Sequence, residues 1–176
     1  DLGADSAQEQ MNTILSHADV WCGVDMAGNE DGIALGEFSP TFARARDAGM
    51  HVTIHAGEAG GPDNVRIAVT TLGAERIGHG VRSAEDPSLM ELLAERGVTL
   101  ETALTSNVQT AASPSLAEHQ IHTLLKAGVR VTLNTDNPTT SHTTLSCEYT
   151  RGGGEAALSR ETLDLLARNA AQASFT

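Results

Sequence analysis

Residues 129–138 read Val129-Arg130-Val131-Thr132-Leu133-Asn134-Thr135-Asp136-Asn137-Pro138. An apolar, β-branched run ends here in a carboxylate, an amide and a proline. This pattern is typical of a buried strand that delivers polar groups to one edge of a sheet. The stretch therefore predicts a strand over residues 129–133, with Asp136 just beyond its carboxyl end as the first candidate functional residue.

The same unit recurs upstream: a helical stretch, a terminating glycine, a short apolar strand and a polar cluster. The terminating glycines are Gly49, Gly73, Gly97 and Gly128. Their spacing suits βα units of a parallel sheet, because hairpins need only about two to five linking residues. The predicted strands are 21–26, 51–55, 77–80, 98–101 and 129–133. The predicted helices are 6–18, 38–46, 63–72, 87–95, 114–127, 143–149 and 158–174.

Polar clusters follow the predicted strands each time. In parallel sheets ligands bind at the carboxyl ends of the strands, where the loops converge. His55, His79, Asp136 and Ser106, in the predicted polar loop 105–107, all fall there. The remaining histidines lie on predicted helices or loops, and we interpret them as ordinary solvated residues: His17, His119, His122 and His142.

His55 and Asp136 carry nitrogen and oxygen donors of the kind that hold Zn²⁺. A catalytic zinc normally takes three protein ligands and a water molecule, and the residues by themselves indicate two. A lone histidine at a strand end can also be an ordinary hydrogen-bonded residue. His55, His79 and Asp136 all fall at the carboxyl ends of predicted strands, which leaves both interpretations open.

Glu58 and His79 are candidates for proton transfer. Glu58 follows His55 by three residues in a glycine-containing loop, where it could act as a general acid or be an ordinary glutamate in the first turn of a helix. His79 lies between Gly78 and Gly80, which allow a close approach of backbone and ligand. It suits a proton shuttle or an electrostatic partner of hydroxide, although an incidental histidine in a glycine turn has the same pattern.

Composition narrows the classes of function. The chain has 176 residues, 40% of them hydrophobic, and a formal net charge of −12. Such a charge repels phosphate backbones and anionic lipid, so we expect no nucleic-acid and no membrane partner. We expect a single domain in the cytoplasm. Cys22 and Cys147 could pair, but two buried thiols in a reducing compartment fit their number and spacing better.

Together these motifs resemble the adenosine deaminase family of metal-dependent purine hydrolases. The resemblance runs from about Trp21 to the end of the chain and rests on five segments in the family's order. They are Asp25-Met26-Ala27-Gly28, His55-Ala56-Gly57-Glu58, Gly78-His79-Gly80, Thr105-Ser106-Asn107 and Asn134-Thr135-Asp136-Asn137-Pro138.

The resemblance implies an α/β fold, a (β/α)8 TIM barrel with one Zn²⁺ at its carboxyl end. By position, His55 and Asp136 would be metal ligands. Glu58 would protonate the purine ring, and His79 would orient or deprotonate the water that zinc activates. Asp136 would also accept a hydrogen bond from that water. The substrate would contact the Gly28 backbone N–H and the amide of Asn137, and Ser106 would support the metal site from behind its ligands.

Three features depart from the family pattern. Asn137 stands where many relatives have a second carboxylate, and an amide N–H can still donate to a ring nitrogen. Ala103 and Leu104 replace a Cys-Pro pair. The family's His-x-His pair, which supplies two further zinc ligands, is absent from the sequence. With about five of eight strands, residues 1–176 are expected to be the C-terminal part of one TIM-barrel domain, an incomplete barrel of about five βα units plus C-terminal helices.

Three functions follow from the resemblance. The first is zinc-dependent deamination of adenosine and 2'-deoxyadenosine in purine salvage by the full-length protein, and the second is deamination of adenine or a substituted adenine. In the third, the chain as it stands is a non-catalytic fragment that binds a complementary half. Open sheet edges could also let it self-associate.

Overall fold

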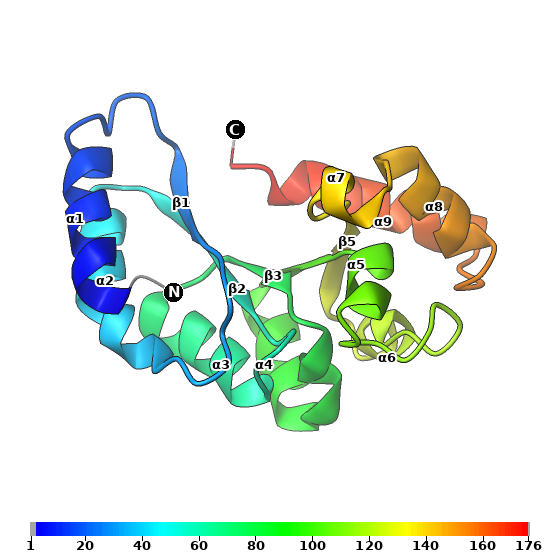
Figure 1. The fold of residues 1–176 in the computed structure, drawn as a ribbon. Helices are drawn as coiled ribbons and strands as arrows, with labels where there is room; N and C mark the ends of the chain where they lie inside the picture. The colour runs from blue at the N-terminus through cyan, green and yellow to red at the C-terminus, as the bar shows by residue number, and fades with distance from the viewer. Residues whose placement is uncertain (1–2, 176) are drawn as a thin grey trace.

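The computed structural model describes residues 3–175, which form one curved, five-stranded parallel sheet with the strand order β1-β2-β3-β4-β5 (Figure 1). Each strand pairs with the next one along the chain, as in Val24 opposite Val52 and Leu100 opposite Val131. The predicted α/β class and the five parallel βα units are therefore confirmed. The strands are β1 (Gly23–Met26), β2 (His51–Ala56), β3 (Arg76–His79), β4 (Thr99–Thr102) and β5 (Arg130–Leu133).

Helices link consecutive strands and lie on the convex side of the sheet, while a C-terminal group lies beside β5 (Figure 1). Gly73 and Gly97 end their helices in the left-handed conformation, as predicted. The helix α1 (Gly3–Leu15) precedes β1 and packs against α2. The linking helices are η1 (Leu35–Phe38), α2 (Ser39–Asp47), α3 (Pro62–Ile67), the π-helical turn η2 (Ala68–Leu72), η3 (Val81–Glu85), α4 (Pro87–Arg96), α5 (Leu104–Gln109) and α6 (Ile121–Lys126). The C-terminal helices are α7 (Pro138–Ser141), α8 (Leu145–Gly153) and α9 (Arg160–Ala173).

The alternation of side chains along the strands separates an apolar from a polar face. Alternate strand residues are fully buried against the helices, among them Val52, Ile54, Ile77, Leu100 and Val131. The residues between them project to the concave side, where side chains of consecutive strands meet. Arg76 of β3 contacts Glu101 of β4 at 3.0 Å and Thr53 of β2 at 3.1 Å. The core therefore lies between sheet and helices, and the concave face is polar.

The predicted loop 105–107 is wrong, because these residues lie inside α5. The carboxylate of Glu148, on α8, accepts a hydrogen bond from the backbone N–H of Thr105 at 3.1 Å and another from the Thr105 hydroxyl. It thereby satisfies a backbone donor that the start of a helix leaves unpaired. A distant residue supplies this cap, so local sequence could not indicate the helix.

The predicted helix 114–127 is shorter than expected, since only α6 is helical. Upstream of it, polar side chains bond to nearby backbone groups in place of helical hydrogen bonds. Gln120 donates to the carbonyl of Ala112 at 2.8 Å, and Ser115 accepts from the backbone N–H of Glu118 at 3.1 Å.

Two smaller expectations are also corrected. Cys22 and Cys147 are free thiols, as predicted, but both are exposed. His119, expected to be a solvated residue, is buried.

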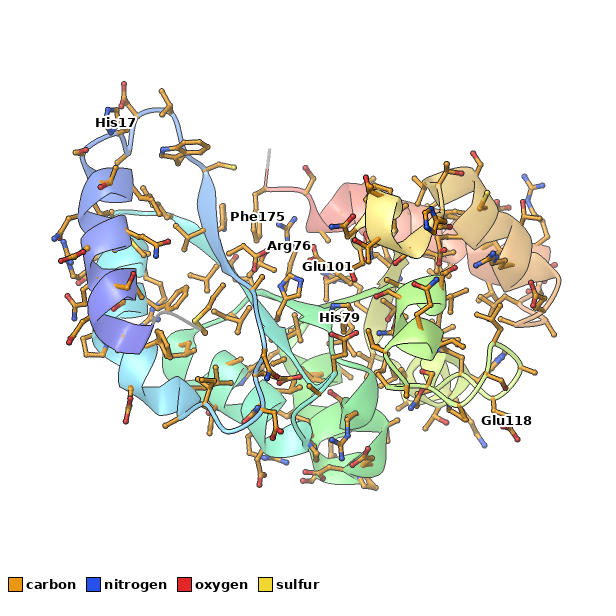
Figure 2. All side chains as sticks on the ribbon, in the orientation of Figure 1. His17, Arg76, His79, Glu101, Glu118 and Phe175 are labelled. Carbon is orange, nitrogen blue, oxygen red and sulfur yellow. The ribbon has the colours of Figure 1, made fainter. Side chains whose placement is uncertain are left out.

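The C-terminal segment lies over the concave face, where Figure 2 labels Arg76, Glu101 and Phe175. The Phe175 ring stacks on His51 with ring centroids 4.3 Å apart, and the Arg76 guanidinium lies 3.6 Å from the Phe175 ring centre. This segment therefore joins strands β2 and β3 from the concave side. None of the helices within residues 3–175 has the length and apolar character that crossing a bilayer requires.

Candidate metal and catalytic site

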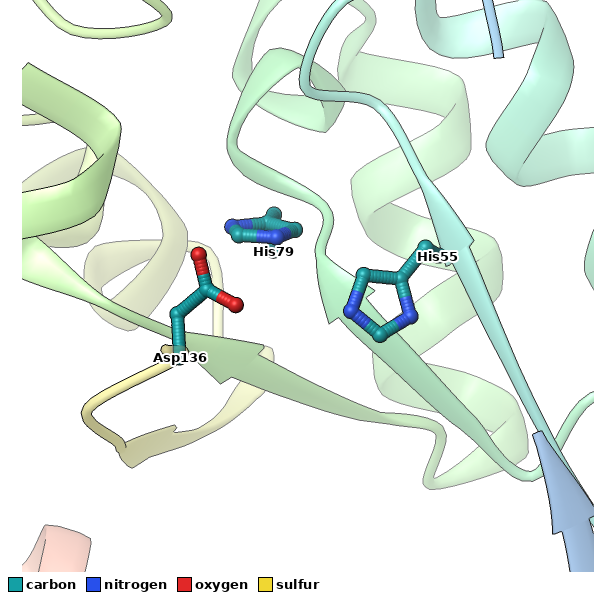
Figure 3. Close-up of side chains that lie close together, drawn as sticks. All are labelled: His55, His79 and Asp136. Atoms are coloured by element: carbon teal, nitrogen blue, oxygen red, sulfur yellow. The ribbon is translucent and has the colours of Figure 1, made fainter. Parts of the chain in front are cut away.

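His55, His79 and Asp136 converge at the carboxyl ends of their strands (Figure 3). Each offers one ligand atom, and these three atoms all lie within 4.8 Å of one another. His55 comes from β2, His79 ends β3, and Asp136 follows β5. The sequence therefore located correctly the residues that share this edge of the sheet.

His55 is held from two sides. Its Nδ1 lies 3.3 Å from the Asp25 carboxylate of β1, which raises the pKa of the imidazole, while burial opposes that rise. Its ring lies directly over Gly78, where an added Cβ would come within 2.9 Å of the ring. Asp25 thus orients the ring and leaves Nε2 as the nitrogen available to a metal ion.

His79 is a buried residue with a left-handed backbone, φ 63°. Its Nδ1 lies 3.0 Å from the side-chain nitrogen of Asn107 and 3.5 Å from Oε1 of Glu58. Burial lowers the pKa of this imidazole, and the nearby Glu58 carboxylate partly opposes the effect. His79 therefore favours the neutral form more than a solvated histidine does.

Asp136 also has a positive φ, 53°, and lies three residues beyond the end of β5. Its Oδ2 accepts a hydrogen bond of 2.6 Å from the Ser106 hydroxyl, so the expected contact of Ser106 with the site is present. In Figure 3 the Asp136 carboxylate points towards His79. Left-handed backbone is uncommon outside glycine, and its use at two of the three converging residues indicates a locally constrained site.

Glu58 lies beside the cluster in a cavity of about 310 Å³ lined by Gly28, Asn29, Glu30, His55, Glu58, Ala59, His79 and Thr110. Its Oε1 accepts a hydrogen bond of 2.8 Å from the Thr110 hydroxyl. The cavity brings together Gly28, Glu58 and His79, three of the residues to which the family resemblance assigns roles in the site. Asp136 lines a neighbouring cavity of about 490 Å³ that also includes His55 and His79.

Asn137 has a second role that the sequence did not indicate. Its side-chain oxygen caps α7 by accepting from the backbone N–H groups of Thr139 and Thr140 at 3.1 and 3.0 Å. Asn137 lines neither of the two cavities described above. Its amide nitrogen is not used by the cap, so a contact with a substrate stays a prediction.

Sequence reasoning missed the residues that hold the loop after β2. The buried carboxylate of Glu30 accepts from the backbone N–H groups of Gly57 and Glu58, at 2.8 and 2.6 Å, and from the Asn64 amide at 3.1 Å. Glu30 therefore fixes the loop that carries Glu58. A glutamate in the polar loop 27–32 gives no local signal of this role, because its partners lie on other elements.

The donor set fits a divalent cation of the zinc type. His55 and Asp136 offer an imidazole nitrogen and a carboxylate oxygen beside the buried His79, and the Asp25 carboxylate holds the outward nitrogen of His55. This is the arrangement that orients ligands in metal sites.

Comparison with known proteins agrees with this geometry. The family model described as adenosine deaminase matches residues 3–176. The chain belongs to the adenosine deaminase family. An adenosine deaminase of Escherichia coli (strain SE11) is 42% identical over 174 residues, which are 99% of this chain and 52% of that protein. The chain thus spans about half the length of this family relative.

Two solved structures share the fold. The adenine deaminase from Arthrobacter aurescens superposes with a TM-score of 0.95 at 29% identity, covering 100% of this chain and 54% of that one. The N6-methyl-AMP deaminase from Arabidopsis thaliana superposes with a TM-score of 0.84 at 30% identity, covering 98% of this chain and 51% of that one. The five-stranded sheet therefore corresponds to about half of each of these larger folds.

Proposed function

We propose that the protein to which this chain belongs deaminates adenosine and 2'-deoxyadenosine by hydrolysis, giving inosine or 2'-deoxyinosine and ammonia in purine salvage. The observation that carries the proposal is the convergence of His55, His79 and Asp136 beside Glu58, in a chain of the adenosine deaminase family. The partner is a small purine molecule, with no nucleic acid and no membrane involved. The cytoplasmic location expected from the sequence stays a prediction.

His55 and Asp136 would hold the metal ion, which we take to be Zn²⁺, as two of its ligands. When bound, zinc supplies a Lewis acid that lowers the pKa of water towards ~7. Ser106 donates to the Asp136 carboxylate and Asp25 binds the outward nitrogen of His55, so both ligands are oriented before the ion arrives.

The remaining residues handle protons and orient the substrate. Glu58 would donate a proton to the purine nitrogen beside the attacked carbon, and Thr110 orients its carboxyl group. His79 and Asp136 orient the attacking water from the side of the cluster. The Gly28 N–H and the free amide nitrogen of Asn137 offer donors to other ring nitrogens, with Gly28 in the same cavity as Glu58.

A second candidate is deamination of adenine or a substituted adenine. It is favoured by the likeness to the adenine deaminase from Arthrobacter aurescens and to the N6-methyl-AMP deaminase from Arabidopsis. In both candidate reactions water attacks the same carbon of the purine ring, so residues 3–175 can serve either reaction. The non-catalytic alternative predicts no deamination by the 176-residue chain alone.

The test measures deamination by the full-length protein. Glu58→Gln and Asp136→Ala should each lower kcat/KM for the purine substrate by about 10²-fold or more, because each removes a group that touches the reacting atoms or the metal. The exposed Glu118→Gln serves as a matched control and should leave the rate unchanged. Normal rates in both site variants would refute the proposal, and comparing kcat/KM for adenosine, adenine and N6-methyl-AMP separates the two candidates.

A further inference from the structure

A buried chain of hydrogen bonds leads away from His79 into the protein. Asn107 lies 3.0 Å from Nδ1 of His79 through its side-chain nitrogen, and its side-chain oxygen lies 3.4 Å from Nε2 of His119. Nδ1 of His119 accepts a hydrogen bond of 3.0 Å from the backbone N–H of Ile121. All three side chains are buried, with exposed fractions of 3% for His79, 0% for Asn107 and 2% for His119.

The donor and acceptor in each of these hydrogen bonds follow from the last bond of the series, the one between Ile121 and His119. A backbone N–H can only donate, so Nδ1 of His119 carries no proton. A neutral imidazole has one N–H, which must then be at Nε2, and it donates to Asn107. The side-chain atom of Asn107 that faces His119 is therefore its oxygen.

The same hydrogen bond from Ile121 to His119 excludes the opposite orientation of the Asn107 amide. It would place the amide N–H₂ against His119, whose Nδ1 is already an acceptor. Both nitrogens of His119 would then have to lack a proton, which no neutral or protonated imidazole allows. Burial supports the neutral state of this ring, since it lowers the pKa of His119 to about 4.

We propose that Asn107 and His119 are positioning residues that hold the proton of neutral His79 on Nε2, by donating the Asn107 amide N–H to Nδ1. Nε2 is then the His79 nitrogen available to the group formed with His55 and Asp136, and in neutral His79 it carries a hydrogen. A nitrogen that bears a hydrogen cannot bind a metal. The chain of bonds therefore makes His79 a hydrogen-bond donor to the site and excludes it as a third metal ligand.

The functional part of this inference rests on the proposed deamination. Neutral His79 with a proton on Nε2 can orient the attacking water by donating to it, and cannot take a proton from it at that nitrogen. Of the two roles that the family resemblance implies for His79, this geometry selects the orienting one.

Nitrogen NMR of the full-length, metal-free protein labelled with ¹⁵N-histidine tests the proposal, because protonated and unprotonated ring nitrogens resonate far apart. His79→Gln identifies the His79 signals by their loss. At neutral pH the Nε2–H form of His79 should exceed the other by roughly tenfold or more, since the alternative leaves buried hydrogen-bonding groups unpaired. A wild-type spectrum with the proton on Nδ1, or with comparable populations of both forms, overturns the proposal.

Asn107→Asp tests the role of the amide directly. A carboxylate only accepts, so Nδ1 of His79 should become protonated in this variant. Asn12→Asp is the matched control, because Asn12 is exposed on α1 and accepts from Arg44 through its oxygen, a contact that aspartate preserves. It should leave the His79 signals unchanged, and an unchanged His79 spectrum in Asn107→Asp overturns the positioning role.

The outcomes separate this inference from the proposed function. The nitrogen spectrum needs neither substrate nor turnover, so the Nε2–H form in a protein without deaminase activity would leave the hydrogen-bond chain standing and refute only the proposed function. Deaminase activity in a protein whose His79 carries its proton on Nδ1 would refute the hydrogen-bond chain and leave the proposed function standing.

Discussion

At the scale of single residues, the site depends on specific hydrogen bonds that hold two residues in uncommon backbone conformations. His79 and Asp136 both adopt left-handed backbone conformations, which cost about 1–3 kcal/mol outside glycine and persist only where the surroundings impose them. The surroundings here are specific: Asn107 holds His79, and Ser106 holds Asp136. Both partners lie on α5, so one helix fixes two members of the cluster.

Gly78→Ala should damage the metal site although it replaces no metal ligand. The new Cβ would come within 2.9 Å of the His55 ring, which must then rotate away from its bond with Asp25. We expect the affinity for zinc, measured by competition with a chelator, to fall about 10-fold or more. Gly36→Ala is the control, because nothing lies within 4 Å of its added Cβ. Equal affinities of the two variants would contradict the positioning of His55 by close packing.

His119 should make stability depend on pH in a defined window. Its pKa falls from 6.5 to about 4 on folding, so between these values the unfolded state binds a proton that the folded state does not. Stability is therefore complete above pH 6.5, falls as the pH drops towards 4 and is constant below, a loss of about 3 kcal/mol. Denaturant unfolding at several pH values should show a flatter dependence in His119→Gln. The same dependence of unfolding free energy on pH in the wild type and in His119→Gln would contradict this role of His119.

Prediction from sequence succeeded for residues whose signal is local. His55 and His79 lie in the last two residues of apolar strands and Asp136 lies three residues beyond one, and the edge of a parallel sheet brings such positions together. Glu30, Asn107 and His119 act through partners on other elements, and their local patterns are those of a loop or a helix. Nothing in one sequence distinguishes such residues from solvated ones.

At the scale of elements, α5 shows how a distant residue determines a helix. Residues 104–109 have few strong helix formers, and the helix begins without a side-chain cap of its own. Glu148 supplies the missing acceptor from α8, and it also accepts a hydrogen bond of 2.7 Å from the Thr143 hydroxyl. The position of the helix that carries Ser106 and Asn107 therefore depends on α8.

Glu148→Ala should lower the free energy of unfolding by about 2–4 kcal/mol, because it leaves buried N–H and O–H donors unpaired and opens a cavity. Glu148→Gln keeps one acceptor oxygen and should cost less. The exposed Glu118→Ala should change stability by less than about 0.5 kcal/mol. Denaturant unfolding of the three variants measures this order, and similar stabilities for Glu148→Ala and Glu118→Ala would contradict the capping of α5.

At the scale of the whole molecule, the described sheet is open. Strands β1 and β5 each pair with one neighbouring strand within residues 3–175. The other edge of β1 has no strand partner there, whereas α9 packs against β5 and the Asn169 amide donates to the Val131 carbonyl at 2.8 Å. Exposed apolar side chains stand close to both edges in sequence or space. Trp21, 55% exposed, precedes β1, and Leu145, 52% exposed, lines the cavity that holds Asp136 beyond β5. The β1 edge therefore combines an unpaired strand with accessible apolar surface, the pattern that favours association of sheets, and Leu145 adds accessible apolar surface near β5.

The chain of residues 1–176, purified as such, should therefore self-associate in a concentration-dependent way. Trp21→Lys, and Leu145→Lys at the other edge, should each raise the dissociation constant about tenfold, since a charge replaces apolar contact area where another sheet would dock. Thr71→Lys adds the same charge at an exposed position on the convex, helix-covered side and should leave association unchanged. Sedimentation over a dilution series measures all three variants. A monomeric wild-type chain would contradict the prediction. An equal effect of Thr71→Lys would also do so, because the added charge alone would then explain the change and the edges of β1 and β5 would not drive association.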